Sequence, residues 1–255
     1  MQRIGLGRIL FAASFAVLGA LGLFVHDFVS MWPLVPKWLA WHGALTMFSG
    51  ALLLVSGAAL LVPRTARISA FVLTGFLLLR LLVLKLPQVA AHPLVELAWY
   101  DVSESLTFVA GGWTILSMLP REDGAFARFG NVRAGQILFA LALPAIGLSH
   151  MFYLGQTAPL IPAWLPFHVP LAYFTGAAHI AAGAGILFGV LPRLAAMLEA
   201  VMVSLFTLLV WVPVVIAAPA SRSDWAEICV STAIAGAAWA IAESFRGTPW
   251  IRWHR

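Results

Sequence analysis

The sequence is poor in charge and in cysteine. Only 10% of its 255 residues are charged, whereas 62% are hydrophobic, and the mean hydropathy is +0.96. A soluble domain needs far more polar surface than this. The single cysteine, Cys229, cannot form an intrachain disulfide, and no CxxC, GxSxG, P-loop or HExxH motif occurs. The sequence therefore excludes a soluble, disulfide-built protein, predicts no metal site and assigns no catalytic residue.

Long apolar runs are abundant in the chain. Each run is long enough to cross the roughly 30 Å hydrocarbon layer of a membrane as a helix. Hydropathy predicts eight transmembrane helices, at 6–25, 39–62, 67–87, 100–119, 134–153, 167–190, 193–213 and 225–243. Prolines at the ends of these runs, such as Pro87 and Pro213, are expected to stop the helices. We therefore predict an all-α polytopic membrane protein.

Arginine and lysine gather on one side of the predicted membrane. That side holds Arg3, Arg8, Arg64, Arg67, Arg121, Arg128, Arg133, Arg193, Arg246, Arg252 and Arg255, whereas the other holds Lys37 and Arg222. Because positive charge marks cytoplasmic loops, both termini are expected in the cytoplasm of a bacterial-type inner membrane. The pI near 10.1 then reflects orientation and attraction to the lipid bilayer rather than to nucleic acid.

An internal repeat relates the two halves of the chain. Residues 34–116 match 160–242 at a shift of 126, without a gap and with 24 identities in 83 positions. The matched residues include Trp38 with Trp164, Trp99 with Trp225, and His42 with His168. We predict two tandem four-helix units, 1–119 and 134–246, joined by a cytoplasmic linker at 120–133 and followed by a basic tail at 247–255. Since four is even, the units should be related by a pseudo-twofold axis along the membrane normal.

Each unit resembles the DoxX/DoxD-like family of four-helix membrane domains. The second unit carries the likeness best, in "GQILFALALPAIGLSHMFYLG", "IPAWLPF", "FTGAAHIAAGAGIL" and "LPRLAA". Some members of that family are membrane subunits of thiosulfate:quinone oxidoreductase, and others accompany redox or detoxification enzymes. The resemblance thus implies a quinone ligand and partner subunits. The first unit departs from the second, with Gly22 in place of His150 and Leu53 in place of His179.

Tryptophans and polar stripes mark the predicted membrane interfaces and interiors. The tryptophans Trp38, Trp164, Trp99 and Trp225 are expected to anchor helix ends at the outer interface. One stripe comprises His42, Thr46 and Ser49, and the corresponding one comprises His168, Thr175 and His179. Their helical spacing puts each set on one face beside small residues, which favours contact with other helices. The stripes could form interhelical hydrogen bonds or line a polar pocket open to the outer side.

Three ionisable residues lie deep inside predicted spans, where charge is costly. They are Arg80, Glu104 and Glu199. We hypothesise that Arg80 pairs with Glu104, and that Glu199 is a protonatable functional group. His179 is the nearest expected partner of Glu199, about 8 Å away in depth by helix rise, so water would bridge them. Lys85 is expected to extend to the outer surface, and Asp101 to stand at the start of its helix.

These features favour a membrane subunit of a redox system that binds quinone or docks a partner oxidoreductase. Two alternatives stay open: a protein that binds or transports a lipid or small molecule, and a structural subunit of a larger complex. No intrinsic cofactor is predicted. A haem held between His42 and His168 is disfavoured, because both histidines lie near the membrane surface and no other metal-ligand spacing occurs.

Overall fold

The computed structural model describes residues 4–28, 38–120 and 130–251, and the regular structure within them is helical. Six long helices are uninterrupted: α1 (Leu6–Val25), α2 (His42–Leu61), α5 (Glu96–Met118), α6 (Val132–Phe152), α8 (His168–Phe188) and α11 (Arg222–Ser244). Two more are built from consecutive segments: α3 (Ala66–Arg80), η1 (Leu81–Lys85) and α4 (Leu86–Ala91), then α9 (Pro192–Phe206), η4 (Thr207–Trp211) and α10 (Val212–Ala217). The short α7 (Leu154–Thr157) and η3 (Ala158–Leu160) follow α6. Parts of the predicted linker and tail fall outside the described residues.

Seven of the long helices, all except α5, are apolar enough to cross a membrane. By length and composition, this indicates a membrane protein. Each of the eight predicted spans coincides with a long helix, and the ends differ by a few residues. The helix α5 is long enough but more polar, since it contains Glu96, Asp101 and Glu104. Helices are the expected form here, because hydrocarbon offers the backbone no hydrogen bonds other than those within the segment.

The expectation that Pro87 and Pro213 stop their helices is wrong. The helical stretches continue beyond them, to Ala91 and Ala217. A π-helical segment precedes each proline, at Leu81–Lys85 and at Thr207–Trp211. A proline ring clashes with the carbonyl group four residues earlier, and the wider π turn makes room for it. The bounds of the second π segment are those of the first plus 126.

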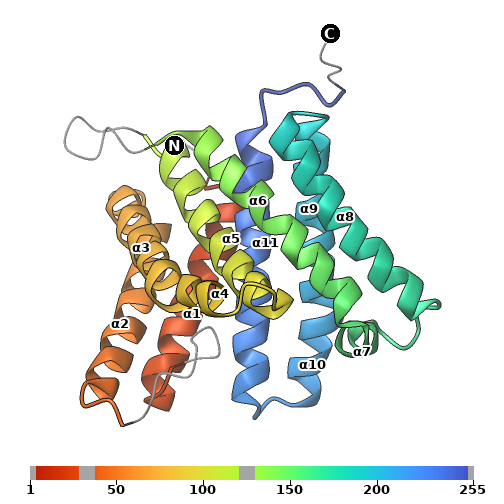
Figure 1. Ribbon diagram of the computed structural model, residues 1–255. Coiled ribbons are helices and arrows are strands. Elements are labelled where there is room, and N and C mark those ends of the chain that lie inside the picture. Colours follow the sequence, from red (N-terminus) through yellow and green to blue (C-terminus); the bar gives the residue numbers. More distant parts are fainter. Residues whose placement is uncertain (1–3, 29–37, 121–129, 252–255) are drawn as a thin grey trace.

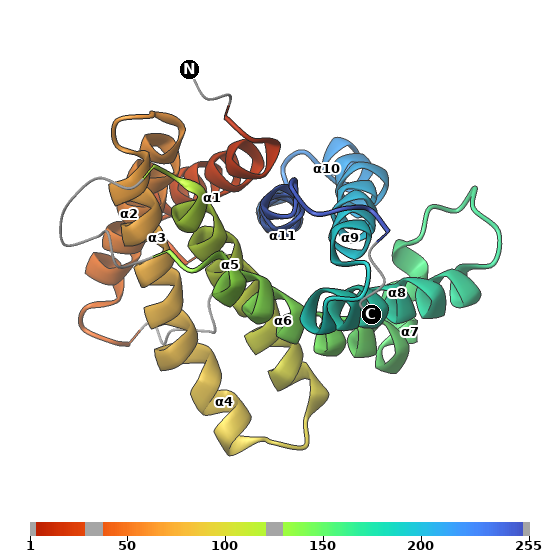
Figure 2. The same ribbon diagram turned by 90° about the horizontal axis from the view of Figure 1, so that it is seen from above.

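Two helices, α5 and α11, contact each other at the centre of the molecule, and helices from both halves surround them (Figures 1 and 2). The first helix, α1, packs on α2 and on α11, whereas α6 packs on α8 and on α5. Helices of residues 1–119 and 134–246 therefore share one core. The described chain starts and ends on the same side (Figure 1), where the Gly7 amide lies 3.4 Å from the Glu243 carboxylate.

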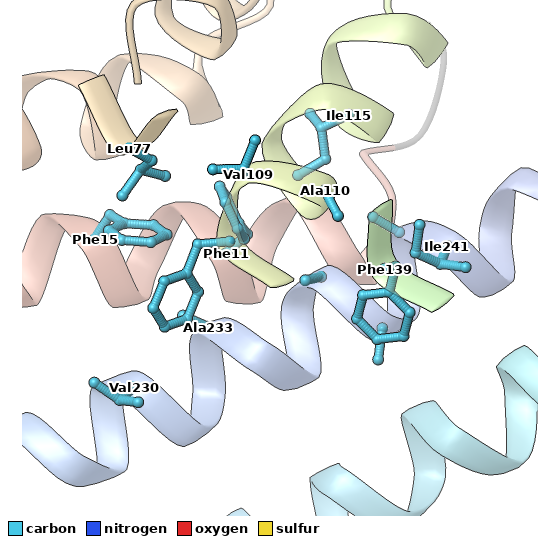
Figure 3. Packing of buried hydrophobic residues seen from close by; sticks show 14 of the residues in the cluster. Phe11, Phe15, Leu77, Val109, Ala110, Ile115, Phe139, Val230, Ala233 and Ile241 are labelled. Atoms are coloured by element: carbon cyan, nitrogen blue, oxygen red, sulfur yellow. The ribbon is translucent and has the colours of Figure 1, made fainter. Parts of the chain in front are cut away.

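Aromatic side chains fill the region where α1 meets α5 and α11 (Figure 3). The Phe15 ring packs edge-on against Phe11 at 4.7 Å and against Phe108 at 5.6 Å between ring centroids. All three side chains are fully buried. Next to them, a Cβ atom added to Gly236 would lie only 2.5 Å from the Phe11 backbone nitrogen, so α1 and α11 touch backbone to backbone. This contact fixes the two halves against each other.

Glycines also allow the closest helix contacts within each half. A Cβ atom on Gly57 would lie 2.5 Å from the Ala16 nitrogen, and one on Gly147 would lie 2.4 Å from the Gly176 carbonyl oxygen. Neither neighbour is a flexible side chain that could move aside. Small residues are the usual means by which helices approach closely in membranes. The pairs α1 with α2 and α6 with α8 therefore depend on the absence of a side chain at these points.

We predict that Gly57→Ala destabilises the protein by about 1–3 kcal/mol, because the new methyl group meets the α1 backbone. Gly75→Ala is the matched control, since a Cβ atom at Gly75 has no neighbour within 4 Å. Thermal unfolding of the detergent-solubilised variants measures both effects. Equal midpoints for the two variants would contradict the proposed backbone contact.

Candidate functional site

The polar stripe on α2 is buried but satisfied by its own helix. The Thr46 hydroxyl donates to the His42 carbonyl oxygen at 2.9 Å, and the Ser49 hydroxyl donates to the Thr46 carbonyl oxygen at 3.0 Å. At the helix start, His42 Nε2 lies 3.6 Å from Asp27 Oδ1. The two hydroxyl groups thus need no partner from another helix.

The stripe on α8 leads to a buried pair of ionisable side chains. His179 Nδ1 lies 2.8 Å from Glu199 Oε1, across the interface between α8 and α9. The two residues are 2% and 1% exposed. A charged or strongly polar pair in such surroundings is expensive unless its members satisfy each other. The imidazole and the carboxyl group share a hydrogen bond through which one proton can move.

A second imidazole stands beside this pair. His150, near the end of α6, lies with its ring centroid 5.1 Å from that of His179, edge to face. His150 Nδ1 is 2.9 Å from the Thr175 hydroxyl oxygen. The Phe206 ring packs against both imidazoles, with centroids 5.9 Å from His150 and 6.0 Å from His179. Side chains from α6, α8 and α9 therefore meet at one place, which we call the histidine site: His150, Thr175, His179, Glu199 and Phe206.

The histidine site has unused hydrogen-bonding capacity. Among the described residues, neither His179 Nε2 nor Glu199 Oε2 has a hydrogen-bond partner, although both atoms are fully buried. Leaving such an atom unsatisfied costs about 1–3 kcal/mol. Protein interiors rarely retain that cost without a reason. A ligand or a transferred proton at these atoms would offset it, which makes this cluster the best candidate functional site.

The expected water between His179 and Glu199 is a wrong prediction, because the two side chains bond directly. The error came from counting depth from predicted helix ends. In the structure a short turn joins Phe188 of α8 to Pro192 of α9. His179 is nine residues before the first and Glu199 seven residues after the second, so their depths differ by only about 3 Å. Side chains span that difference.

The ionisable residues of the first half form a separate group around α5. Lys85 Nζ lies 3.1 Å from Asp101 Oδ2, and the Tyr100 hydroxyl donates to Glu104 Oε2 at 3.2 Å. Arg80 is buried, and both Glu104 and Asp101 act on it electrostatically. Lys85 is thus buried and paired rather than extended to the surface.

Asp101 also differs from its expected place at a helix start. The helix α5 begins at Glu96, one turn earlier, so Asp101 lies within it and faces Lys85. The reason is that α5 starts before the apolar run from which its start was predicted. Asp101 thus serves as the partner of a buried lysine and does not cap its helix.

The predicted interface tryptophans divide into two pairs. Trp38 and Trp164 are 82% and 71% exposed. Trp99 and Trp225 donate their indole N–H to the carbonyl oxygens of Pro93 and Pro219, at 2.9 and 3.0 Å. These last two bonds tie the starts of α5 and α11 to the turns before them. The donor and acceptor residues of the second bond lie 126 residues after those of the first.

His42 and His168 are not brought together. They begin α2 and α8, which lie on opposite flanks of the molecule in both views (Figures 1 and 2). The described residues also contain no group of three or more His, Cys, Asp or Glu side chains placed to hold a metal ion. An open groove of about 480 Å³ lies between the start of α5 and the middle of α6, lined by residues such as Trp99, Pro144 and Leu148, and it includes no member of the histidine site.

Sequence reasoning named Thr175, His179 and Glu199 but did not place His150 among the site residues. The signal for His150 was present in the repeat, where the first half has Gly22 in the matching position. The stripes were traced along one helix at a time, so they could not include His150, which comes from α6 whereas Thr175 comes from α8. A comparison of the non-matching positions in the two halves would have found the residue.

Comparison of the chain with protein-family models, with curated proteins and with solved structures finds no match. The resemblance to the DoxX/DoxD-like family therefore stays a prediction. Any function has to be argued from the histidine site itself.

We predict that Glu199→Leu destabilises the protein by about 3 kcal/mol, because it leaves His179 buried without its partner. The double variant His179→Leu/Glu199→Leu should lose less than the sum of the two single variants. Leucines occupy the positions 126 residues earlier, Leu53 and Leu73, and both are buried there. A double-mutant cycle on the free energy of unfolding in detergent measures the coupling. Strictly additive losses would mean that the two side chains do not interact.

Proposed function

We propose that the protein is an integral membrane subunit of a redox system, and that its histidine site binds the headgroup of a quinone. The observation that carries this proposal is the buried His179–Glu199 pair, whose remaining polar atoms have no partner among the described residues. The pair is enclosed by apolar helices, so a ligand that reaches it laterally has to be soluble in lipid. A quinone headgroup is neutral, flat and polar at two opposite oxygens.

The chemistry of the site suits the proton side of quinone reactions. Reduction of a quinone to a hydroquinone takes two electrons and two protons. Imidazole and carboxyl groups within hydrogen-bond distance of each other can pass protons. The Phe206 ring lies against both imidazoles and offers an aromatic face to a flat ring. The proposal assigns the supply of both electrons to a partner oxidoreductase.

The proposed arrangement in the membrane has eight spans, with α5 as the additional one. The units 1–119 and 134–246 are then tandem DoxX/DoxD-like copies related by a pseudo-twofold axis along the membrane normal, with both termini in the cytoplasm of an inner membrane. Support comes from element bounds that recur after 126 residues, as in α5 and α11. The contact between Gly7 and Glu243 also puts the two ends of the helical bundle on one side. The excess of arginine on that side sets the orientation.

We predict that quinone extracted from the purified protein falls at least about tenfold in Glu199→Gln, since the loss of one charged hydrogen-bonding group is worth roughly this factor. The variant keeps the shape of the side chain. Glu104→Gln, which changes a carboxylate on α5 outside the histidine site, is the matched control and should retain wild-type quinone content. Organic extraction followed by mass spectrometry measures the amounts. Absence of quinone from wild type even after incubation with excess quinone would count against the function.

A further inference from the structure

The two contacts of the Thr175 hydroxyl favour one position for the ring proton of His150. A threonine hydroxyl has a single hydrogen to donate. Thr175 gives it to the Ala172 carbonyl oxygen, at 3.0 Å, within its own helix. The same oxygen also lies 2.9 Å from His150 Nδ1. Both contacts are hydrogen bonds at the same time only when Nδ1 carries the ring proton and donates it to the Thr175 oxygen.

It follows that the other ring nitrogen of His150 is an acceptor. A neutral imidazole carries one N–H group, and the second nitrogen then presents a lone pair. With the proton held at Nδ1, this lone pair is on Nε2. The hydrogen bond of His150 to Thr175 uses Nδ1, and the residue as a whole is only partly buried. Nε2 of this half-buried residue is then the acceptor that the inferred tautomer offers to a ligand.

His150 is the most accessible of the three ionisable side chains in the histidine site. His150 is half-buried, whereas His179 and Glu199 behind it are almost completely enclosed. The flank of α8 beside it is apolar, with Phe174 67% exposed. A ligand from the lipid can therefore reach His150 more readily than the enclosed pair.

We infer that the histidine site prefers a ligand whose headgroup donates a hydrogen bond, and that it therefore favours hydroquinone over quinone. The choice of headgroup rests on the proposed function, but the preference comes from the Thr175–His150 arrangement. A hydroquinone hydroxyl can donate to the lone pair on Nε2. A quinone carbonyl oxygen brings a second lone pair to the same place and can form no bond there. Thr175 is a positioning residue in this scheme, because it acts on the ligand only through His150.

The test compares the affinities of a decyl-tailed hydroquinone and its matching quinone for the detergent-solubilised protein. The titrations are anaerobic and at about pH 8, where an ordinary imidazole is neutral. We expect the hydroquinone to bind about tenfold more tightly than the quinone, because it forms a hydrogen bond where the quinone makes an unfavourable contact. The variant Thr175→Val removes the oxygen that accepts the hydrogen bond from His150 Nδ1. The ring can then take either tautomer, and the ratio of the two affinities should fall toward one. Thr175→Ser keeps the acceptor and should restore the ratio.

The outcomes separate this inference from the proposed function. If the wild-type protein binds hydroquinone and quinone equally well, and Glu199→Gln weakens both, the preference is wrong but the quinone site stands. If neither compound binds, or if Glu199→Gln affects neither, the quinone site itself is wrong. A direct measurement does not depend on any variant folding: nitrogen NMR of ring-labelled histidine in wild type should show His150 protonated at Nδ1. A proton at Nε2 would overturn the inference.

Discussion

The close approach of α6 and α8 is the contact on which the histidine site depends. Gly147 and Gly176 touch backbone to backbone, and a Cβ atom added to Gly176 would lie 2.6 Å from the Gly147 carbonyl oxygen and 3.1 Å from the His150 Cβ atom. His150 is about one turn beyond Gly147, and Thr175 is next to Gly176 in the chain. The imidazole can reach the hydroxyl group only because no side chain separates the two helices there. Helix packing and site geometry are thus one feature.

Polar residues inside this bundle fall into two kinds that differ in where their hydrogen bonds go. Hydroxyl groups such as those of Thr46 and Ser49 donate to carbonyl oxygens one turn earlier and are satisfied within their own helix. They can be buried at small cost and carry little information about function. Imidazole and carboxylate groups cannot be satisfied in this way. His179 and Glu199 need each other across a helix interface, and each still has one polar atom left over.

The helices could be predicted from the sequence, because hydrocarbon permits few other backbone structures and the apolar runs are long. Their ends could not, since a rule that stops helices at proline takes no account of the π turns before Pro87 and Pro213. In the site, the face of α8 that carries Thr175 and His179 followed from helical spacing alone. The direct bond to Glu199 and the part played by His150 depend on how three helices meet. Spacing within one helix holds no information about that.

Corresponding positions of the two halves show how differently each uses its interior. Leu53 and Leu73 are buried where the second half has His179 and Glu199. Arg80 stands where the second half has Phe206, and its electrostatic neighbours are carboxylates on α5. The same backbone positions can therefore be filled by apolar side chains, at no cost in unsatisfied polar atoms. A histidine and a glutamate in their place leave two buried polar atoms unpaired among the described residues, which costs stability. This difference between the halves is why the second half is the place to look for a ligand.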